Sequence, residues 1–298
     1  MSSDEIDLAT IAEKLAQSPD YRVLRRLSPR TEFASCEGAA TKVGILLDVE
    51  TTGLNMAQDE IIELAMVKFD YLPDDKIARI THVFSSFNEP SNPIPTEITE
   101  LTGITDELVS GHRIDPDAVS AFVSDAVIIV AHNASFDRKF VERYWPIFER
   151  KHWACSATEV EWRRLGFDGS RLAYLLAGVG LFHQAHRAID DCRALIEILA
   201  AKVPKMNRSA FAILLERARR KTVRIWAEQS PFELKDTLKR RGYKWSDGSD
   251  GRPRSWYVDV DHAGKEDEID FLRKAIYLQD VEPRVQFVSA MNRFSIRV

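Results

Sequence analysis

The sequence has few cysteines and no long hydrophobic run. Its three cysteines, Cys36, Cys155 and Cys192, are scattered and odd in number, which excludes a disulfide framework and a cysteine zinc site. No apolar run reaches about 18 residues, so no membrane-spanning helix and no membrane partner are expected. The first residues are acidic where a secretory signal needs basic residues before an apolar block. We therefore expect a cytoplasmic protein.

Negative charge slightly exceeds positive charge overall, but basic residues are concentrated in one region. The net charge is -5, yet residues 205–254 contain fourteen basic and six acidic residues. Two interpretations stay open for this region: solvated helix faces, or a surface that contacts the phosphate backbone of a nucleic acid.

The 298 residues suffice for about two domains. Residues 43–50, 61–71 and 80–87 have the length and apolar content of strands, and three strands in succession predict an antiparallel meander. Helical patterns and a further strand at 127–133 follow, which predicts a mixed α/β sheet flanked by helices on both faces. This unit covers residues 41–203, after an N-terminal extension at 1–40.

The remaining chain predicts a second, smaller unit. Residues 204–221 form a basic, partly helical connector, and residues 222–298 alternate strand and helix patterns as a small α+β domain does. This unit combines basic residues with the aromatic residues Trp226, Tyr243, Trp245, Trp256 and Tyr257. We hypothesise that it helps to hold single-stranded nucleic acid, because aromatic rings stack on unpaired bases. The alternative is that the tryptophans form the core of a small domain.

Two acids end the first strand. Side chains alternate between the faces of a strand, so Asp48 and Glu50 point the same way and repel each other unless a proton or a cation intervenes. Oxygen ligands of this kind suit Mg²⁺ or Mn²⁺. Alone, the pair is more typical of a solvated strand end than of a functional site.

Two later segments supply further acids. In IIVAHNASFDRKF, Asp137 lies in the first turn of an expected helix, where the helix dipole alone would also favour it. In HQAHRAIDDCRALIEIL, Asp191 shares the buried stripe of a helix, whereas Asp190 faces solvent. His183 and His186, with only Cys192 nearby, make a poor zinc set.

Together, DVETTGL (48–54), HNASFD (132–137) and HRAIDD (186–191) resemble the three motifs of the DEDDh (DnaQ-like) 3′→5′ exonucleases. This family includes the proofreading epsilon subunit of bacterial DNA polymerase III, ribonuclease T and oligoribonuclease. The resemblance covers about residues 43–200 and implies a ribonuclease H-like fold. A mild departure is Cys192, where alanine is commoner.

The resemblance also implies the site and the reaction. Asp48, Glu50, Asp137 and Asp191 match the acids that bind two Mg²⁺ or Mn²⁺ ions, and His186 matches the general base. Two such ions support hydrolysis that releases nucleoside 5′-monophosphates from a 3′ end. The residues expected to contact the terminal nucleotide are Thr51, Thr52, Gly53, Leu54, Thr102, Gly103, Ile104, His132 and Asn133. Plain turn or packing roles are the alternative for these residues.

The expected partner is single-stranded nucleic acid or a 3′ end. DNA is favoured over RNA, although no residue decides between them, and no feature indicates an oligomeric state. Two other functions stay open. One is a catalytically idle nucleic-acid-binding scaffold on the same fold, against which the presence of all four acids and the histidine argues. The other is a proofreading subunit that works within a DNA polymerase.

Overall fold

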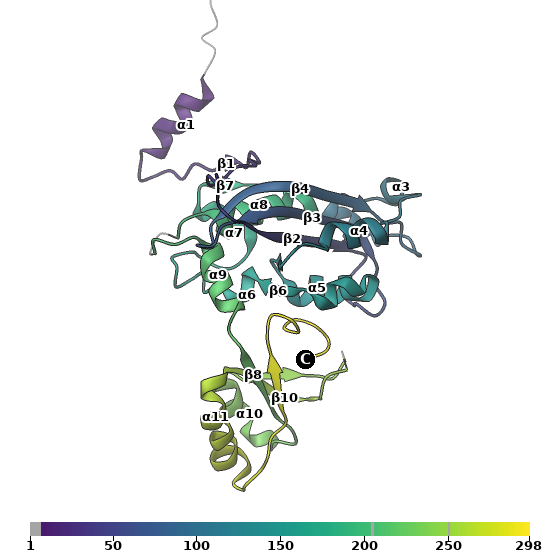
Figure 1. Ribbon diagram of the computed structural model, residues 1–298, viewed down its shortest axis with the longest axis vertical. Coiled ribbons are helices and arrows are strands. Elements are labelled where there is room, and N and C mark those ends of the chain that lie inside the picture. The colour runs from purple at the N-terminus through teal and green to yellow at the C-terminus, as the bar shows by residue number, and fades with distance from the viewer. Residues whose placement is uncertain (1–6, 204–205, 250) are drawn as a thin grey trace, which may run out of the picture.

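The computed structural model describes residues 7–203, 206–249 and 251–298. Two bodies are joined end to end, a larger one built on a five-stranded sheet and a smaller one built on a four-stranded sheet (Figure 1). Among the described residues, no helix is long and apolar enough to cross a bilayer.

The larger sheet has the strand order β4-β3-β2-β5-β6. β2, β3 and β4 form the predicted antiparallel meander, and β5 and β6 run parallel to β2. This mixed arrangement confirms the expected ribonuclease H-like fold. The strands are β2 (Lys42–Thr51), β3 (Ile61–Tyr71), β4 (Ile77–Phe87), β5 (Ile128–Ala131) and β6 (His152–Cys155).

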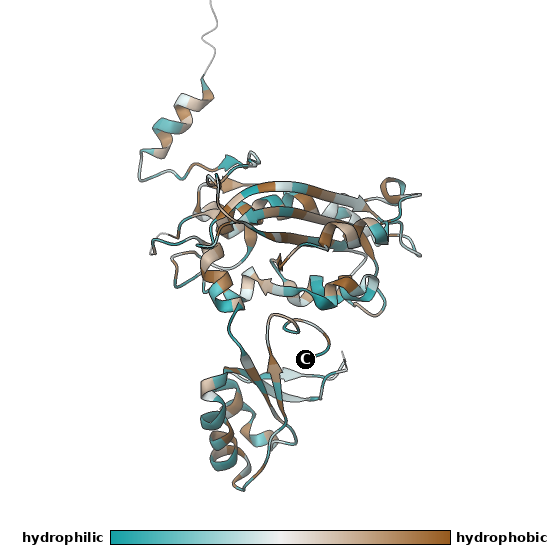
Figure 2. Cartoon of the chain, viewed as in Figure 1, coloured by the Kyte–Doolittle hydropathy of each residue, from teal (hydrophilic) through white to brown (hydrophobic). Residues whose placement is uncertain are grey.

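Helices cover both faces of this sheet because its central strands are apolar on both faces. All eleven residues of β3 are buried, and hydrophobic residues predominate in the middle of the sheet (Figure 2). The helices of this body are α2 (Thr96–Thr102), α3 (Asp106–Val109), α4 (Pro116–Val123), α5 (Ala134–Tyr144), η1 (Pro146–Arg150), α6 (Ser156–Glu159), α7 (Leu172–Gly178), α8 (Ala188–Ala200) and α9 (Ala210–Ala218).

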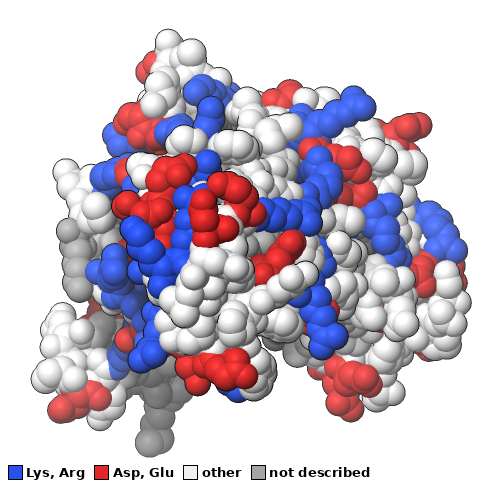
Figure 3. Space-filling view, turned by 90° about the horizontal axis from the view of Figure 1, so that it is seen from below, with Lys and Arg blue, Asp and Glu red and all other residues white. Residues whose placement is uncertain are grey.

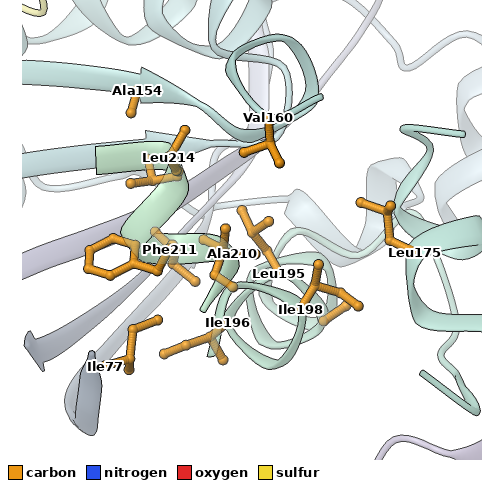
Figure 4. Close-up of a cluster of buried hydrophobic side chains, with 14 of the residues drawn as sticks. Ile77, Ala154, Val160, Leu175, Leu195, Ile196, Ile198, Ala210, Phe211 and Leu214 are labelled. Carbon is orange, nitrogen blue, oxygen red and sulfur yellow. The ribbon is translucent and has the colours of Figure 1, made fainter. Parts of the chain in front are cut away.

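Alternation along β2 divides the core into two clusters. Ile45, Leu47 and Val49 pack beneath α4 and α5. Leu46 points to the other face and belongs to the cluster under α7, α8 and α9, part of which is drawn in Figure 4. Asp48 and Glu50 follow Leu46 by two and four residues in the same strand, so their side chains point to the same face of the sheet, the one that α8 covers.

The segment expected as a basic connector contributes to the larger core. Phe211 of α9 is completely buried and packs edge-on against Phe69 and Tyr71, at ring-centroid distances of 5.4 and 5.2 Å. Leu214 lies in the same cluster (Figure 4). Residues 204–221 were predicted to be a connector because they are rich in basic residues. The apolar residues of α9 at i, i+3 and i+4 instead form a stripe that packs on the sheet.

The second half of the N-terminal extension is attached to the larger body. Residues 1–6 lie outside the described part, and α1 (Leu8–Ala16) has no buried residue and projects from the body (Figure 1). β1 (Arg25–Arg26) then pairs in parallel with β7 (Leu181–Phe182).

The C-terminal module, residues 222–288, has an antiparallel sheet of order β11-β8-β10-β9. Its helices pack on the face that carries Val223, Ile225 and Ala227. Trp226 is buried on the opposite face, whereas Trp245 is 50% exposed. The elements are β8 (Thr222–Ala227), η2 (Phe232–Leu234), α10 (Lys235–Arg240), β9 (Lys244–Ser246), β10 (Ser255–Asp261), η3 (His262–Gly264), α11 (Lys265–Phe271), the π-helical η4 (Leu272–Tyr277) and β11 (Val285–Val288).

After β11, the tail (residues 289–298) returns to the larger body and surrounds one arginine of α5. The guanidinium of Arg138 is completely buried. It donates to the carbonyls of Met291 and Arg293, both at 2.7 Å, and to Glu142 at 2.6 Å. Ser295 also donates to Glu142, at 2.6 Å. The tail therefore anchors α5, the helix that carries Asp137, and deleting the whole of 222–298 would remove this anchor as well.

Replacing Arg138 should destabilise the protein strongly. Arg138→Met keeps the apolar stem but leaves buried carbonyls and a buried carboxylate without their donor, which costs about 3 kcal/mol of the free energy of unfolding. This cost is at the low end of the range for breaking a buried ion pair, because Glu142 would still accept a hydrogen bond from Arg297 at 3.0 Å. Urea unfolding followed by circular dichroism measures the change. The control is Arg150→Met, at an exposed position, and an equal loss in both variants would contradict the anchoring role.

Candidate active site

Three acids from two distant segments meet at the end of β2. Asp48 and Glu50 project from the face that α8 covers, and Asp191 projects from the first turn of α8. Carboxylate oxygens of these three residues all lie within 4.8 Å of one another. The neighbouring Asp190 is 41% exposed and pairs with Arg193 at 3.5 Å, as expected for the solvated member of the two adjacent aspartates.

The fourth predicted acid, Asp137, approaches from the other face of the sheet. It is 2% exposed, and its Oδ1 accepts a hydrogen bond from the backbone N–H of Val49 at 3.3 Å. Since Val49 lies between Asp48 and Glu50, this bond places Asp137 directly beside them. The structure thus brings together all four acids that the sequence singled out.

Crowding changes the ionisation of these acids. Burial, followed by the negative charges of Asp137 and Asp191, raises the pKa of Asp48 well above its usual range. Burial and the charge of Asp191 raise the pKa of Glu50 to about 8. Burial likewise raises the pKa of Asp137 to about 7. Such a cluster is fully ionised at neutral pH only if positive charge is supplied, and an all-oxygen donor set fits Mg²⁺ or Mn²⁺.

Two histidines flank Asp191. The Nε2 atom of His183 lies 2.6 Å from Asp191 Oδ1, and the His183 side chain is only 6% exposed. The backbone N–H of His186 donates to Asp191 Oδ2 at 3.0 Å, while its side chain is exposed and its φ of 67° lies in the left-handed region. Sequence reasoning considered His183 only as a zinc ligand and missed its contact with Asp191.

A buried ion pair fixes the start of α8. Glu63, completely buried on β3 opposite Glu50, accepts from Arg187 at 3.1 Å and from the backbone N–H of Ala188 at 3.2 Å. This contact satisfies an otherwise unpaired donor at the helix N-terminus. The sequence did offer a signal, because Glu63 interrupts an apolar strand and Arg187 lies inside the third motif.

Two of the acids, Asp48 and Asp191, line a cavity of about 540 Å³. His132 lines it and is held on both sides, with Nδ1 at 2.8 Å from Ser156 Oγ and Nε2 at 2.7 Å from the Ser170 carbonyl. Burial lowers the pKa of His132. Asn133 is exposed at the start of α5 and accepts from Ser135 at 2.9 Å. The other lining residues include Arg171, His183 and His186.

The segment after Glu50 forms a tight turn. Thr51 donates through its hydroxyl to the Gly53 carbonyl at 2.6 Å, and Thr52 accepts from the Glu60 backbone N–H at 2.9 Å. A Cβ on Gly53 would lie 2.5 Å from a carboxylate oxygen of Asp59, so any larger residue here would have to displace the Asp59 side chain. Leu54, at the tip, is 86% exposed. The turn therefore presents an apolar side chain beside the acids.

The residues of the LTGIT segment have packing roles. The Thr102 hydroxyl donates to the Ile98 carbonyl at 2.8 Å, and Gly103 ends α2 in the left-handed region. Ile104 is completely buried in a small cluster with Ile62, Ile94 and Val109. Packing thus accounts for these three positions, and their contact with a nucleotide stays a prediction.

Comparisons with known proteins agree with this geometry. The family model RNase_T, described as exonuclease, matches residues 45–199. The PolC-type DNA polymerase III of Thermotoga maritima is 30% identical over 226 residues, which cover 70% of this chain and 15% of that protein. The DNA polymerase III subunit epsilon of Treponema pallidum is 32% identical over 165 residues, which cover 52% of this chain and 74% of that protein.

Solved structures show the same fold. The zinc-bound form of the E. coli ExoI–ssDNA complex aligns with a TM-score of 0.50 at 15% identity, over 74% of this chain and 63% of that chain. The chain spans only a small part of the PolC-type polymerases that it matches. Because the exonuclease family model covers just over half of the chain, including the four acids and His186, the chain belongs to the RNase_T exonuclease family.

Proposed function

We propose that the chain is a metal-dependent 3′→5′ exonuclease that releases nucleoside 5′-monophosphates. The observation that carries this proposal is the meeting of Asp48, Glu50 and Asp191 within 4.8 Å, with Asp137 hydrogen-bonded to the strand between the first two. The four carboxylates would hold two Mg²⁺ or Mn²⁺ ions. Such a pair, when bound, stabilises negative charge on the attacking and leaving oxygens of an in-line displacement.

Each histidine has a separate role in the proposal. His186, exposed at the cavity, takes the proton of the attacking water through a ring nitrogen, since imidazole titrates near neutrality. His183 is a positioning residue that holds the Asp191 carboxylate, as the partners of metal ligands do.

The 3′-terminal nucleotide would lie between the acids and the turn after Glu50. Leu54 is exposed enough to wedge against its base, and the backbone of Thr51–Gly53 allows close approach. His132 and Asn133, which line the cavity, would also contact this nucleotide. Thr102–Ile104 would line the base pocket only through their backbone, because the Ile104 side chain is buried.

The proposed substrate is single-stranded nucleic acid or a 3′ end, with DNA favoured over RNA. Support comes from the relatives, whose names identify them as parts of DNA polymerase III. Similarity to an epsilon subunit also favours a second candidate function, proofreading within a polymerase. Activity of the purified chain in the absence of any polymerase separates the two. A cytoplasmic location stays a prediction.

Removal of one metal-binding acid should abolish hydrolysis. Asp48→Ala should slow digestion of 5′-labelled single strands, DNA and RNA of matched sequence, by more than about 100-fold, because even the partners of metal ligands change activity by about 10–100-fold. Gel analysis of the shortened products in Mg²⁺ or Mn²⁺ measures the rate. The matched control is the exposed Asp190→Asn, which should stay near wild type. A wild-type rate for Asp48→Ala would refute the site assignment.

Substitution of the two histidines should have different consequences. His186→Ala should lower kcat by roughly 10²–10⁴-fold, without recovery at high metal concentration. His183→Gln should instead weaken metal affinity by about 10–100-fold, with the pH profile unchanged and most of kcat regained at high metal concentration. The measurement is kcat against pH and metal concentration. The reverse pattern would make His183 the base.

Without divalent cation, stability should fall as pH rises. The folded pKa of Glu50, about 8, lies above the unfolded value of about 4.3, so the folded state binds more protons between these values. Stability is therefore highest below the unfolded pKa and declines until pH reaches about 8. Urea midpoints in EDTA at several pH values test this. Glu50→Gln should flatten the decline, and saturating Mg²⁺ should reverse it. A metal-free stability that rises over this interval would contradict the assignment.

A further inference from the structure

A second cavity, of about 520 Å³, lies between the larger body and the C-terminal module. One wall is α5 and α6, and the other is the face of the module's sheet that its helices leave open (Figure 1). We propose that this interdomain cleft binds the phosphate backbone of the single strand on the 5′ side of the terminal nucleotide. The inference rests on the proposed exonuclease function and assigns the cleft a part in it.

The lining of the cleft has a clear excess of positive charge. Within the described part of the chain, its charged side chains are six basic ones and two acidic ones: Lys139, Arg217, Arg224, Lys244, Arg252, Arg293, Glu159 and Asp259. Arg217 also pairs at 3.5 Å with Asp261, which lies outside the lining. Both acids are already engaged, Glu159 by Arg293 and Asp259 by Arg224 at 2.7 Å. Among the residues that the structure describes, no acid lies within ion-pairing distance of Lys244. A chain with a net charge of -5 thus places a local positive potential in this cleft.

Two of the arginines are held by an aromatic ring. The guanidinium carbons of Arg224 and Arg252 lie 4.4 and 5.5 Å from the ring centroid of Tyr257. Stacking of this kind fixes a guanidinium group before a ligand arrives, which reduces the entropy lost on binding phosphate. Because both groups stack on Tyr257, the cleft is better suited to the sugar–phosphate backbone than to a stacked base.

The cleft continues toward the acids along α5. Ser135 and Lys139 line this cleft and also the groove beside Leu54 and Met56. Ser135 in turn donates to Asn133, a residue of the cavity that contains Asp48. Ser249, from the loop between β9 and β10, lines the same groove as Leu54. A strand with its 3′ end at the acids can therefore run past Leu54 into the cleft.

On the face of the molecule seen from the end of the module, basic and acidic side chains are intermingled (Figure 3). A duplex or an acidic peptide would therefore find no extended basic surface there. A single strand already engaged by its 3′ end needs only a narrow basic path.

The test compares short and long substrates with the full chain. Lys244→Ala and Arg252→Ala, combined, should raise KM for a single-stranded DNA of about 20 nucleotides roughly tenfold, and reduce the slope of log KM against log salt by about 1.4. Cleavage of a trinucleotide, too short to reach the cleft, should be unchanged. The matched controls are Lys274→Ala, a lysine of η4 outside the cleft, and Phe287→Ala, an exposed aromatic residue of β11.

Three outcomes would overturn the inference: an unchanged KM for the long strand, an equal loss on the trinucleotide, or an equal effect of Lys274→Ala. If the wild type cleaves neither substrate, the proposed function fails separately. Fluorescence anisotropy with the same labelled long strand then tests whether the cleft binds it. An affinity roughly tenfold weaker in the double variant than in the wild type would support the inference, and equal affinities would overturn it. Competition by blunt duplex DNA as strong as by single strand would overturn the assignment to a single strand.

Discussion

Four carboxylates crowded at the end of one strand repel each other, and much of this structure serves to hold them there. Charged acids within a few ångströms of each other raise the free energy of the folded state unless protons or cations compensate. The scaffold supplies directional restraints in place of compensating charge: the Val49 N–H holds Asp137, and His183 with the His186 backbone holds Asp191. Asp48 and Glu50 need less, because they lie on a strand whose backbone is paired with β3 as far as Glu50.

The two helices that deliver acids to β2 are each anchored by one buried arginine–glutamate pair. Arg187 and Glu63 fix the first turn of α8, next to Asp191. Arg138 and Glu142 fix α5, next to Asp137, and the chain tail completes the coordination of Arg138. A buried pair of this kind contributes little net stability compared with apolar packing, but breaking it is costly. Its advantage here is a unique position for each helix relative to the strand.

The acids were predictable from the sequence, and their supports were not. Asp48, Glu50, Asp137 and Asp191 lie in three short motifs whose combination resembles the DEDDh exonucleases, whereas strand alternation and a helix start, taken singly, left structural roles open. The contact of Glu63 with Arg187 joins residues 124 positions apart, and no periodicity reports such a pairing. The contact of His183 with Asp191 was not predicted, because His183 was considered only as a zinc ligand and its partner is a carboxylate. The packing of α9 in the core was not predicted, because the segment is rich in basic residues and its apolar stripe is short.

The proposed catalytic site and the proposed substrate cleft both involve α5. This helix carries Asp137 and is anchored through Arg138 by the tail, and Ser135 and Lys139 of its first turns line the interdomain cleft. A strand bound in the cleft would therefore contact the same helix that positions one of the acids proposed to bind metal. Because the tail follows directly from β11 and its carbonyls accept hydrogen bonds from Arg138, it connects the module to α5. Point substitutions within the cleft can separate substrate binding from helix anchoring, whereas removal of the module would disturb both at once.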